Sequence, residues 1–424
     1  MKRRHISYIA VLSVALLLLA TPAPEAAGLS ALRAGERHFA AGENTAAERA
    51  YHEAESLLPR SPEPALRLVA LYRDWDRPQE GLAALEAALR QGGDPAELVE
   101  QRLALLAASE EWEQLEDAAR LRLQVAPEDS LALAFLTTAL LQQGKCDAAR
   151  AAATEWHTVA PENVTAQRVW SSLATTTEDD LQLGQSLLRQ RQWGLAACVL
   201  ERAVSAEPTS AEAQAWLGAM LDRLARPAES LPHLEQATVL APTAPLGWLL
   251  LGMHRLRAGD TQAAREALLQ AQRLDAGNPA PCLGMAAVLA AESRYTEVGT
   301  WTEAALERAP EDVEVWKSVA RFYLERNLNL EEGALPAAEG ATRLAPTDAE
   351  AWMLLGWARL LAGDAPQALA ALDIATRLDN SLARAYHLRG LALRALGREA
   401  EARQVLIHAE DLGYRERLSD AARP

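Results

Sequence analysis

Histidine and cysteine are the residue types in this sequence best suited to nucleophilic or metal chemistry. The chain has eight histidines and three cysteines among 424 residues. No two histidines stand three or four positions apart, so none share a helix face as a metal-binding pair, and His38 is expected to be an unpaired surface residue. The motifs G-x-S-x-G, G-x-x-x-x-G-K-[ST], G-x-G-x-x-G after a strand and H-E-x-x-H are absent. We therefore expect no catalytic residue, no metal site and no cofactor.

The three cysteines, Cys146, Cys198 and Cys282, lie far apart and form no Cys-x-x-Cys pair. This pattern excludes a cysteine-based zinc site and a disulfide framework. Two interpretations remain open. Either all three are small buried residues on helices, or Cys146 and Cys198 form a single disulfide in an oxidising compartment.

The composition indicates an all-helical protein that does not bind nucleic acid. Half of the residues are hydrophobic but only 5% are aromatic, so the apolar residues are mostly Ala and Leu, which favour helices. Runs rich in Val, Ile and Thr, which would indicate strands, are missing. The 58 acidic residues exceed the 42 basic residues, and the net charge of −16 repels a phosphate backbone.

Residues 1–27 have the pattern of an export signal. Three basic residues near the start precede the uncharged segment Ile6–Ala20, which is too short to span a bilayer as an ordinary transmembrane helix. Cleavage is expected near Ala23 or Ala27, with an uncleaved inner-membrane anchor as the alternative. Only three of the 42 basic residues are lysine, a bias typical of GC-rich bacterial genomes. The expected location is therefore the bacterial periplasm, either in soluble form or tethered to the membrane through the N-terminus.

The chain repeats itself with a period of 34 residues. Segments 203–208, 237–242, 305–310 and 341–346 all begin with Ala and end with Pro, and the first three are spaced by multiples of the period. Counting from them gives eleven blocks over residues 28–416, interrupted by an insertion at 164–176 and by two extra residues near 327–330. The blocks begin at Gly28, Pro62, Ala96, Ser130, Thr177, Ala211, Pro245, Pro279, Val313, Ala349 and Ala383.

Each block is predicted to form two amphipathic helices joined by a tight turn. Asp94 followed by Pro95 is expected to start a helix, and Thr209–Glu212 and Thr347–Glu350 have the spacing of capping boxes. Small residues recur at the eighth and twentieth positions of the blocks, where the two helices must approach closely. Glycine occupies the eighth position at Gly35, Gly184, Gly218, Gly252, Gly356 and Gly390, and alanine the twentieth at Ala47, Ala149, Ala196, Ala264, Ala368 and Ala402.

This pattern resembles the tetratricopeptide repeat (TPR). Two blocks match it closely, through Trp248, Leu251, Gly252, Ala264 and Ala271 and through Trp352, Leu355, Gly356, Ala368 and Ala375. The resemblance implies an all-α fold, a right-handed α-solenoid of about eleven helix hairpins. Block three departs from the pattern with Leu103 and Leu115 at positions for small residues, so the N-terminal third is expected to be irregular.

The predicted organisation has five parts. Residues 1–27 are the signal or anchor, 28–163 an N-terminal array of four repeats, 164–176 an inserted helix, 177–416 a C-terminal array of seven repeats, and 417–424 a tail. The insertion is the place where the solenoid is expected to divide into two arms.

The family's geometry turns the first helix of each repeat towards the concave face, which such arrays use for binding. In blocks six, seven and ten the inner positions are unusually apolar, with Lys317 and Arg321 interrupting them in block nine. The apolar residues are Trp216, Leu249, Leu250, Met253, Leu256, Met353, Leu354, Trp357 and Leu360. They form either a groove for an apolar peptide or helix, or packing between neighbouring helices. Lys317 and Arg321 would hold a carboxylate of the ligand or an intramolecular partner such as Glu314 or Glu350.

The resemblance implies a non-catalytic scaffold that binds protein partners, and it points to the assembly of envelope or secretion machinery. Two alternatives remain open. One is a self-associating module whose repeats pack into a homo-oligomer, and the other is an enzyme with a cryptic site in residues 28–176.

Overall fold

The computed structural model describes residues 24–174 and 179–414, and throughout these ranges the regular structure is helical, with no strand. This outcome confirms the all-α prediction. Most of the predicted export signal, residues 1–23, lies outside the described residues. Within the described part of the chain, no helix is both long enough and apolar enough to span a bilayer.

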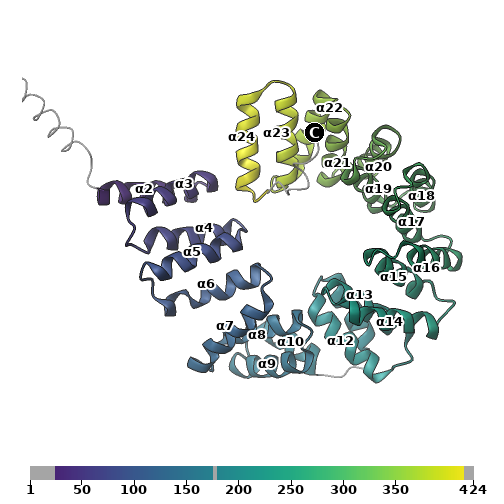
Figure 1. Ribbon diagram of the computed structural model, residues 1–424, viewed down its shortest axis with the longest axis horizontal. Helices are drawn as coiled ribbons and strands as arrows, with labels where there is room; N and C mark the ends of the chain where they lie inside the picture. The colour runs from purple at the N-terminus through teal and green to yellow at the C-terminus, as the bar shows by residue number, and fades with distance from the viewer. Residues whose placement is uncertain (1–23, 175–178, 415–424) are drawn as a thin grey trace, which may run out of the picture. The chain divides into compact units, whose positions relative to one another are not determined.

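The helices form two compact units (Figure 1). The first contains residues 407–414, at the end of α24, together with α2 (Pro24–Ala40), α3 (Asn44–Leu57), α4 (Glu63–Asp74), α5 (Pro78–Arg90) and α6 (Pro95–Ala108). The second begins with α7 (Trp112–Val125), α8 (Ser130–Gln142), α9 (Cys146–Val159), α10 (Val164–Ala174), α11 (Asp180–Arg189), α12 (Trp193–Ala206), α13 (Ala211–Arg223), α14 (Pro227–Leu240), α15 (Pro245–Arg257) and α16 (Thr261–Leu274). It continues with α17 (Ala280–Ala291), α18 (Tyr295–Arg308), α19 (Val313–Arg326), the π-helix η1 (Leu330–Ala334), α20 (Leu335–Leu344), α21 (Ala349–Leu361), α22 (Ala365–Leu378), α23 (Ala383–Ala395) and the first part of α24 (Glu399–Asp411).

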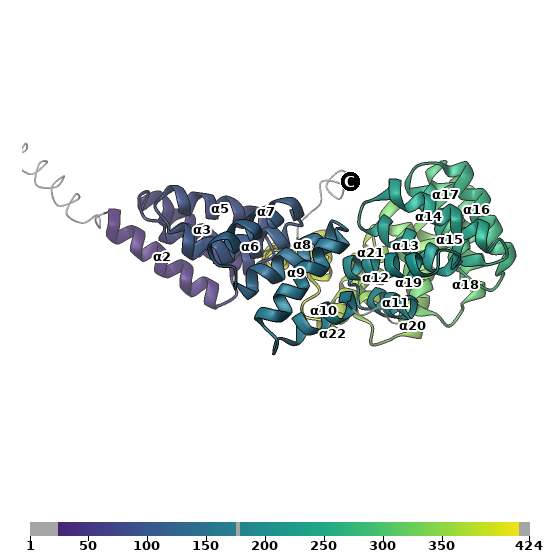
Figure 2. The same ribbon diagram turned by 90° about the horizontal axis from the view of Figure 1, so that it is seen from below.

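Within each unit, consecutive helices pair as antiparallel hairpins that stack on one another (Figures 1 and 2). In the second unit the first helices of neighbouring hairpins also touch, α13 with α15, α15 with α17, α19 with α21 and α21 with α23. The first helices therefore lie on the inner side of the stack and the second helices on the outer side. The solenoid predicted from the 34-residue period is confirmed.

The small residues at the two predicted positions are the points of closest approach in the hairpins. A Cβ atom added to Gly356 would lie 2.5 Å from Cγ of Leu372, and one added to Gly252 would lie 2.7 Å from Cγ of Leu268. The alanines at the twentieth position, such as Ala264 and Ala368, are completely buried. The sequence rule therefore has a steric cause: the first helix crosses its partner over the side chain sixteen residues further along the chain, which is Tyr51 opposite Gly35 and a leucine opposite the other five glycines.

Replacing Gly356 with Ala should lower the free energy of unfolding by about 2 kcal/mol, because the added methyl group overpacks the contact with Leu372. Gly299, in the middle of α18, provides a matched control, since a Cβ there would meet no atom within 4 Å. Gly299→Ala should raise stability by up to about 1 kcal/mol through helix propensity. Urea unfolding, monitored by circular dichroism, measures the free energy of unfolding of both variants. Equal effects for the two variants would contradict the proposed helix crossing.

The start of α6 is as predicted, but two predicted capping boxes are wrong. Asp94 caps α6 by accepting a hydrogen bond from the backbone of Ala96, and Pro95 occupies the first helical position. The caps of α13 and α21 are Ser210 and Asp348, one residue after the threonines expected to cap. In each case the polar side chain immediately before the first helical residue accepts the backbone hydrogen bond.

Block three coincides with the boundary between the two units. Leu103 in α6 and Leu115 in α7 stand at positions where other blocks have Gly or Ala, and both are buried within their own unit. Helix α6 packs on α5, whereas α7 packs on α8. The boundary lies between Glu110 and Glu111, and not at the insertion, because bulky residues occupy the crossing positions of this block.

The insertion forms one helix, α10, as predicted. Arg202 of α12 joins it to the next hairpin. Its guanidinium group donates hydrogen bonds to the carbonyl oxygens of Ser172 and Leu173 at the end of α10 and pairs with both carboxylate oxygens of Asp180 at the start of α11. These contacts satisfy helix-terminal carbonyl groups that would otherwise lack donors.

A disulfide joins Cys146, at the start of α9, to Cys198 in α12, so the second of the two interpretations of these cysteines is the one found in the structure. The bond spans 52 residues of sequence and bridges the insertion. Cys282 is a free, buried thiol, and burial raises its pKa. A raised thiol pKa lowers the fraction of reactive thiolate, so Cys282 acts as a packing residue.

Candidate partner-binding face

The predicted site residues lie on the first helices of the second unit, which form its inner side: α13, α15, α19 and α21. We define the inner face as the part of these helices that carries them. None of the eleven is exposed: three are buried and eight are half-buried. The half-buried residues are Trp216, Leu249, Leu250, Met253, Leu256, Arg321, Trp357 and Leu360. Each of these eight side chains therefore packs against the rest of the protein with one part and leaves another part accessible.

Helix α15 contributes the largest part of the apolar inner face. Leu249, Met253 and Leu256 pack with one side against a buried cluster centred on Leu268 and Met285. Leu250 instead packs towards the neighbouring cluster that contains Leu234 and Leu251. The core thus fixes the orientation of these four side chains and leaves part of each accessible.

Helix α21 divides its predicted residues between the core and the surface. Met353 and Leu354 are 5% and 1% exposed, so they belong to the core and cannot contact a ligand as proposed from the sequence. Trp357 remains half-buried, and the guanidinium carbon of Arg384 lies 4.1 Å from the centroid of its ring. This cation–π contact, which the sequence pattern did not reveal, orients the indole ring.

Lys317 and Arg321 have intramolecular partners, one of the two alternatives left open by the sequence. The ammonium group of Lys317 lies 2.7 Å from Glu314, 2.8 Å from Asp348 and 3.1 Å from Glu350. Arg321 pairs with the other carboxylate oxygen of Glu350 at 2.5 Å. The sequence did not indicate Asp348, because its place beside Lys317 depends on the stacking of adjacent repeats. The cations are satisfied within the chain, so a ligand carboxylate would have to displace these acids.

This cluster makes stability depend on pH. Burial would raise the pKa of Asp348 and of Glu350, but the hydrogen bonds and positive charge of Lys317 outweigh it and hold both pKa values below their usual range. A carboxyl group whose pKa is lower in the folded state stabilises the fold above its unfolded pKa, near 4, and loses that contribution as the pH falls further.

Lys317→Met should lower the free energy of unfolding by about 2 kcal/mol at pH 7, because three carboxylates then face one another without their shared cation. The difference from the wild type should shrink as the pH falls below about 4. Lys145→Met is the control, since the Lys145 side chain is 49% exposed and should contribute less than about 1 kcal/mol. Chemical unfolding at several pH values measures this. A loss that does not change with pH would exclude charge as its cause.

Three tryptophans hold the first helices in place. The indole N–H groups of Trp248, Trp316 and Trp352 each donate a hydrogen bond, 2.8–3.0 Å long, to the carbonyl oxygen of the proline six residues earlier. These prolines, Pro242, Pro310 and Pro346, end the preceding repeats. The repeated Pro and Trp positions therefore fix where α15, α19 and α21 begin, and with them this part of the inner face.

One cluster has the residue types of a hydrolytic triad but not its geometry. His254 Nδ1 lies 2.8 Å from Asp222 and 3.4 Å from the hydroxyl of Ser230. Ser230 donates its hydrogen bond to the carbonyl oxygen of Gly218. A proton relay needs the two imidazole nitrogens to face different partners, whereas here one nitrogen faces both. The arrangement is a buried polar contact.

Across residues 24–174 and 179–414, no group of three or more His, Cys, Asp or Glu side chains could hold a metal ion.

Family models for the tetratricopeptide repeat match residues 181–245, 221–279 and 332–383, and a second such model matches residues 383–412. The matched segments contain α13, α15 and α21 of the inner face, with their glycine crossings, and do not include α19. The chain is a tetratricopeptide repeat protein. The resemblance seen in the sequence is confirmed, and a TPR array of this kind is in general a protein-binding scaffold.

Similar solved structures share little sequence identity with this chain. Yeast Tom70 is 14% identical, with 93% of each chain covered and a TM-score of 0.40. TTC0263, a TPR protein of Thermus thermophilus, is 23% identical, covering 43% of this chain and 98% of its own, with a TM-score of 0.39. MamA of Desulfovibrio magneticus RS-1 is 22% identical, covering 39% and 92%, with a TM-score of 0.34. No curated protein matches the sequence significantly.

Proposed function

We propose that this TPR protein is a non-catalytic adaptor of the bacterial cell envelope that holds a partner protein during assembly of envelope or secretion machinery. The partner would present an apolar or amphipathic segment to the inner face. The observation that carries the proposal is the row of half-buried apolar side chains on α13, α15 and α21. Covering the exposed part of such side chains gives about 25 cal/mol per Å².

The binding residues of the proposal are those that retain accessible surface: Trp216, Leu249, Leu250, Met253, Leu256, Trp357 and Leu360. Their positions are set by the cores of the hairpins and by the Trp–Pro hydrogen bonds. A face whose side chains are already ordered loses little conformational entropy on binding. An amphipathic helix or an extended apolar segment suits a row of this kind.

Two features support export. The basic start and the uncharged segment Ile6–Ala20 have the order of a secretory signal. The Cys146–Cys198 disulfide suits an oxidising compartment such as the bacterial periplasm. Fusion of alkaline phosphatase to the C-terminus tests this part. Activity in cells that depends on residues 1–27 is expected, and an inactive fusion would contradict export.

A photo-reactive amino acid at Met253 tests the site in living cells, with Val239 as the matched control. Val239 lies on the adjacent outer helix α14 and is 71% exposed. A defined protein should become cross-linked from position 253 and not from position 239. Products that form equally from both positions, or from Val239 alone, would refute the inner face as the binding site.

A further inference from the structure

The end of the last helix is seated on the N-terminal repeats. Residues 407–414 belong to the same compact unit as α2–α6, although roughly 300 residues of sequence separate the two parts. The indole N–H of Trp75 donates a hydrogen bond of 2.5 Å to the carbonyl oxygen of Glu410. The side-chain amide of Asn44 donates one of 2.9 Å to the carbonyl oxygen of Asp411. Two carbonyl groups at the end of α24 thus receive donors from α3 and from the residue that follows α4.

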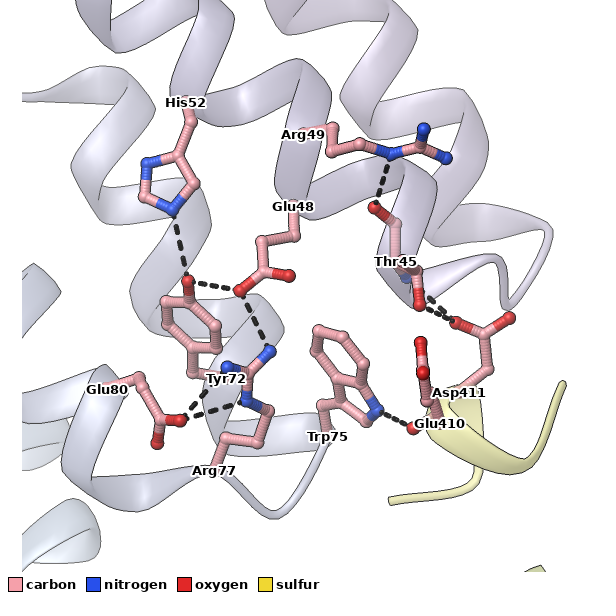
Figure 3. Close-up of polar contacts among 10 residues, drawn as sticks. All are labelled: Thr45, Glu48, Arg49, His52, Tyr72, Trp75, Arg77, Glu80, Glu410 and Asp411. Atoms are coloured by element: carbon pink, nitrogen blue, oxygen red, sulfur yellow. Dashed lines mark hydrogen bonds and ion pairs between the residues drawn. The ribbon is translucent and has the colours of Figure 1, made fainter. Parts of the chain in front are cut away.

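Asp411 also caps α3 from outside that helix. Its Oδ1 accepts hydrogen bonds from the backbone N–H of Thr45, at 2.8 Å, and from the Thr45 hydroxyl, at 2.9 Å (Figure 3). In α21 the equivalent bond comes from Asp348, the helix's own capping residue. The residue at the capping position of α3 is Glu43, and its side chain makes no capping hydrogen bond. A carboxylate from the other end of the chain therefore supplies the missing cap and favours the dipole of α3.

The residues that receive the end of α24 are Asn44, Thr45 and Trp75, and we call them the seat. The seat is also held by contacts that do not involve residues 407–414. Arg77 lies over the rings of Tyr72 and Trp75, 4.9 Å and 4.4 Å from their centroids. It also forms ion pairs with Glu48 at 2.8 Å and Glu80 at 2.9 Å (Figure 3). This network positions the Trp75 indole through residues of α3, α4, α5 and the connection between α4 and α5 alone.

Residues 407–414 are ordered by hydrogen bonds among themselves. Gly413, with a φ of 87°, ends α24 in the left-handed conformation. The backbone N–H groups of Gly413 and Tyr414 then bond to the carbonyl oxygens of Glu410 and Ala409, which is the pattern of a Schellman cap. The segment is therefore an ordered helix end that carries a carboxylate in its last turn.

We propose that Asn44, Thr45 and Trp75 form a second binding site, specific for the C-terminal turn of a helix that ends in an aspartate. In the resting chain, residues 410–411 of the same molecule occupy it. The inner face takes apolar segments, whereas this site recognises backbone carbonyl groups and one carboxylate. The two sites are independent, and this proposal does not rest on the function proposed for the inner face.

A labelled peptide with the sequence of residues 399–414 tests the site. Full-length Asp411→Ala protein, whose own segment has lost its cap contact, should bind this peptide at least tenfold more tightly than the wild type does. A peptide with Ala at the position of Asp411 should not bind. Asp147→Ala, which removes a carboxylate that is 96% exposed in α9, should behave like the wild type. Fluorescence anisotropy gives all four affinities.

Two further results decide between recognition and a general loss of structure. Adding Trp75→Phe to the Asp411→Ala protein should weaken peptide binding about tenfold, because the ring is kept and the donor is lost. Hydrogen exchange at the amide of Thr45 should be at least tenfold faster in Asp411→Ala than in the wild type. Equal peptide affinity for wild type and variant, absence of binding to the variant, or unchanged exchange at Thr45 would each overturn the proposal.

Discussion

Removal of the Cys146–Cys198 disulfide is expected to lower the free energy of unfolding of the region around the insertion by about 4 kcal/mol. The bond closes a loop of 52 residues, and the loss of chain entropy in the unfolded state grows with the length of the loop. The loop contains α10 and α11, which the rest of the fold holds mainly through Arg202 and through packing on α9 and α12. Without the covalent link, α9 and α12 can separate with the insertion between them.

The Cys146→Ser/Cys198→Ser variant should therefore unfold at lower urea concentration than the oxidised wild type, and reductant should bring the wild type down to the same midpoint. Cys282→Ala is the control, because this thiol is buried but unpaired, and its response to reductant should equal that of the wild type. Hydrogen exchange should localise the change to α9–α12. Identical unfolding midpoints for wild type and double variant without reductant would show that the bond is absent in solution.

The second large effect concerns partner binding. Replacing both Leu250 and Met253 with Asp should weaken partner binding at least a hundredfold, because two apolar contacts are lost and two carboxylates would have to be desolvated. Both side chains are half-buried on α15, so part of each is available to a partner. Helical content should stay near that of the wild type, because the buried residues Leu251 and Leu268 are unchanged.

Val239→Asp is the matched control, because it places the same charge on the outer helix α14 at a position that is 71% exposed. The Val239→Asp protein should bind the cross-linked partner with the same affinity as the wild type. Circular dichroism on all three proteins separates loss of binding from loss of fold. Unchanged binding by the Leu250→Asp/Met253→Asp protein would contradict the proposed site.

The repeated part of the fold could be predicted from the sequence because each repeat depends on contacts within itself and with its neighbours. The period located the hairpins, and the small residues at the eighth and twentieth positions marked the helix crossings found at Gly356 and Ala368. Local signals were less reliable at single residues. Ser210 and Asp348, and not the threonines before them, cap their helices, because two adjacent polar residues compete for the same backbone donor.

The candidate site was predicted only in part, since the family pattern gives the direction of a side chain but not its depth. Met353 and Leu354 share inner positions with Leu249 and Leu250, yet they are buried by the packing of their own repeat and its neighbours. The partners of Lys317 depend on which residues of the next repeat stand beside it. Contacts of this kind are set by the stacking of repeats, which composition and spacing do not specify.

The seat of the last helix could not be predicted at all. Its contacts join Thr45 to Asp411, which lie 366 residues apart, and no periodic pattern relates them. Glu43, at the place of a cap but unsuited to capping, is the one local signal that α3 needs a capping partner from elsewhere. A helix start without Ser, Thr, Asp or Asn at the capping position is too common to identify such a partner from the sequence.

Hydrogen exchange of the protein with and without its cross-linked partner tests the central claim most directly. If the partner lies on the inner face, amides of the first helices α13, α15 and α21 should become protected, and those of the outer helices α14, α16 and α22 should not. Protection confined to the outer helices, or spread over both sets alike, would contradict the account.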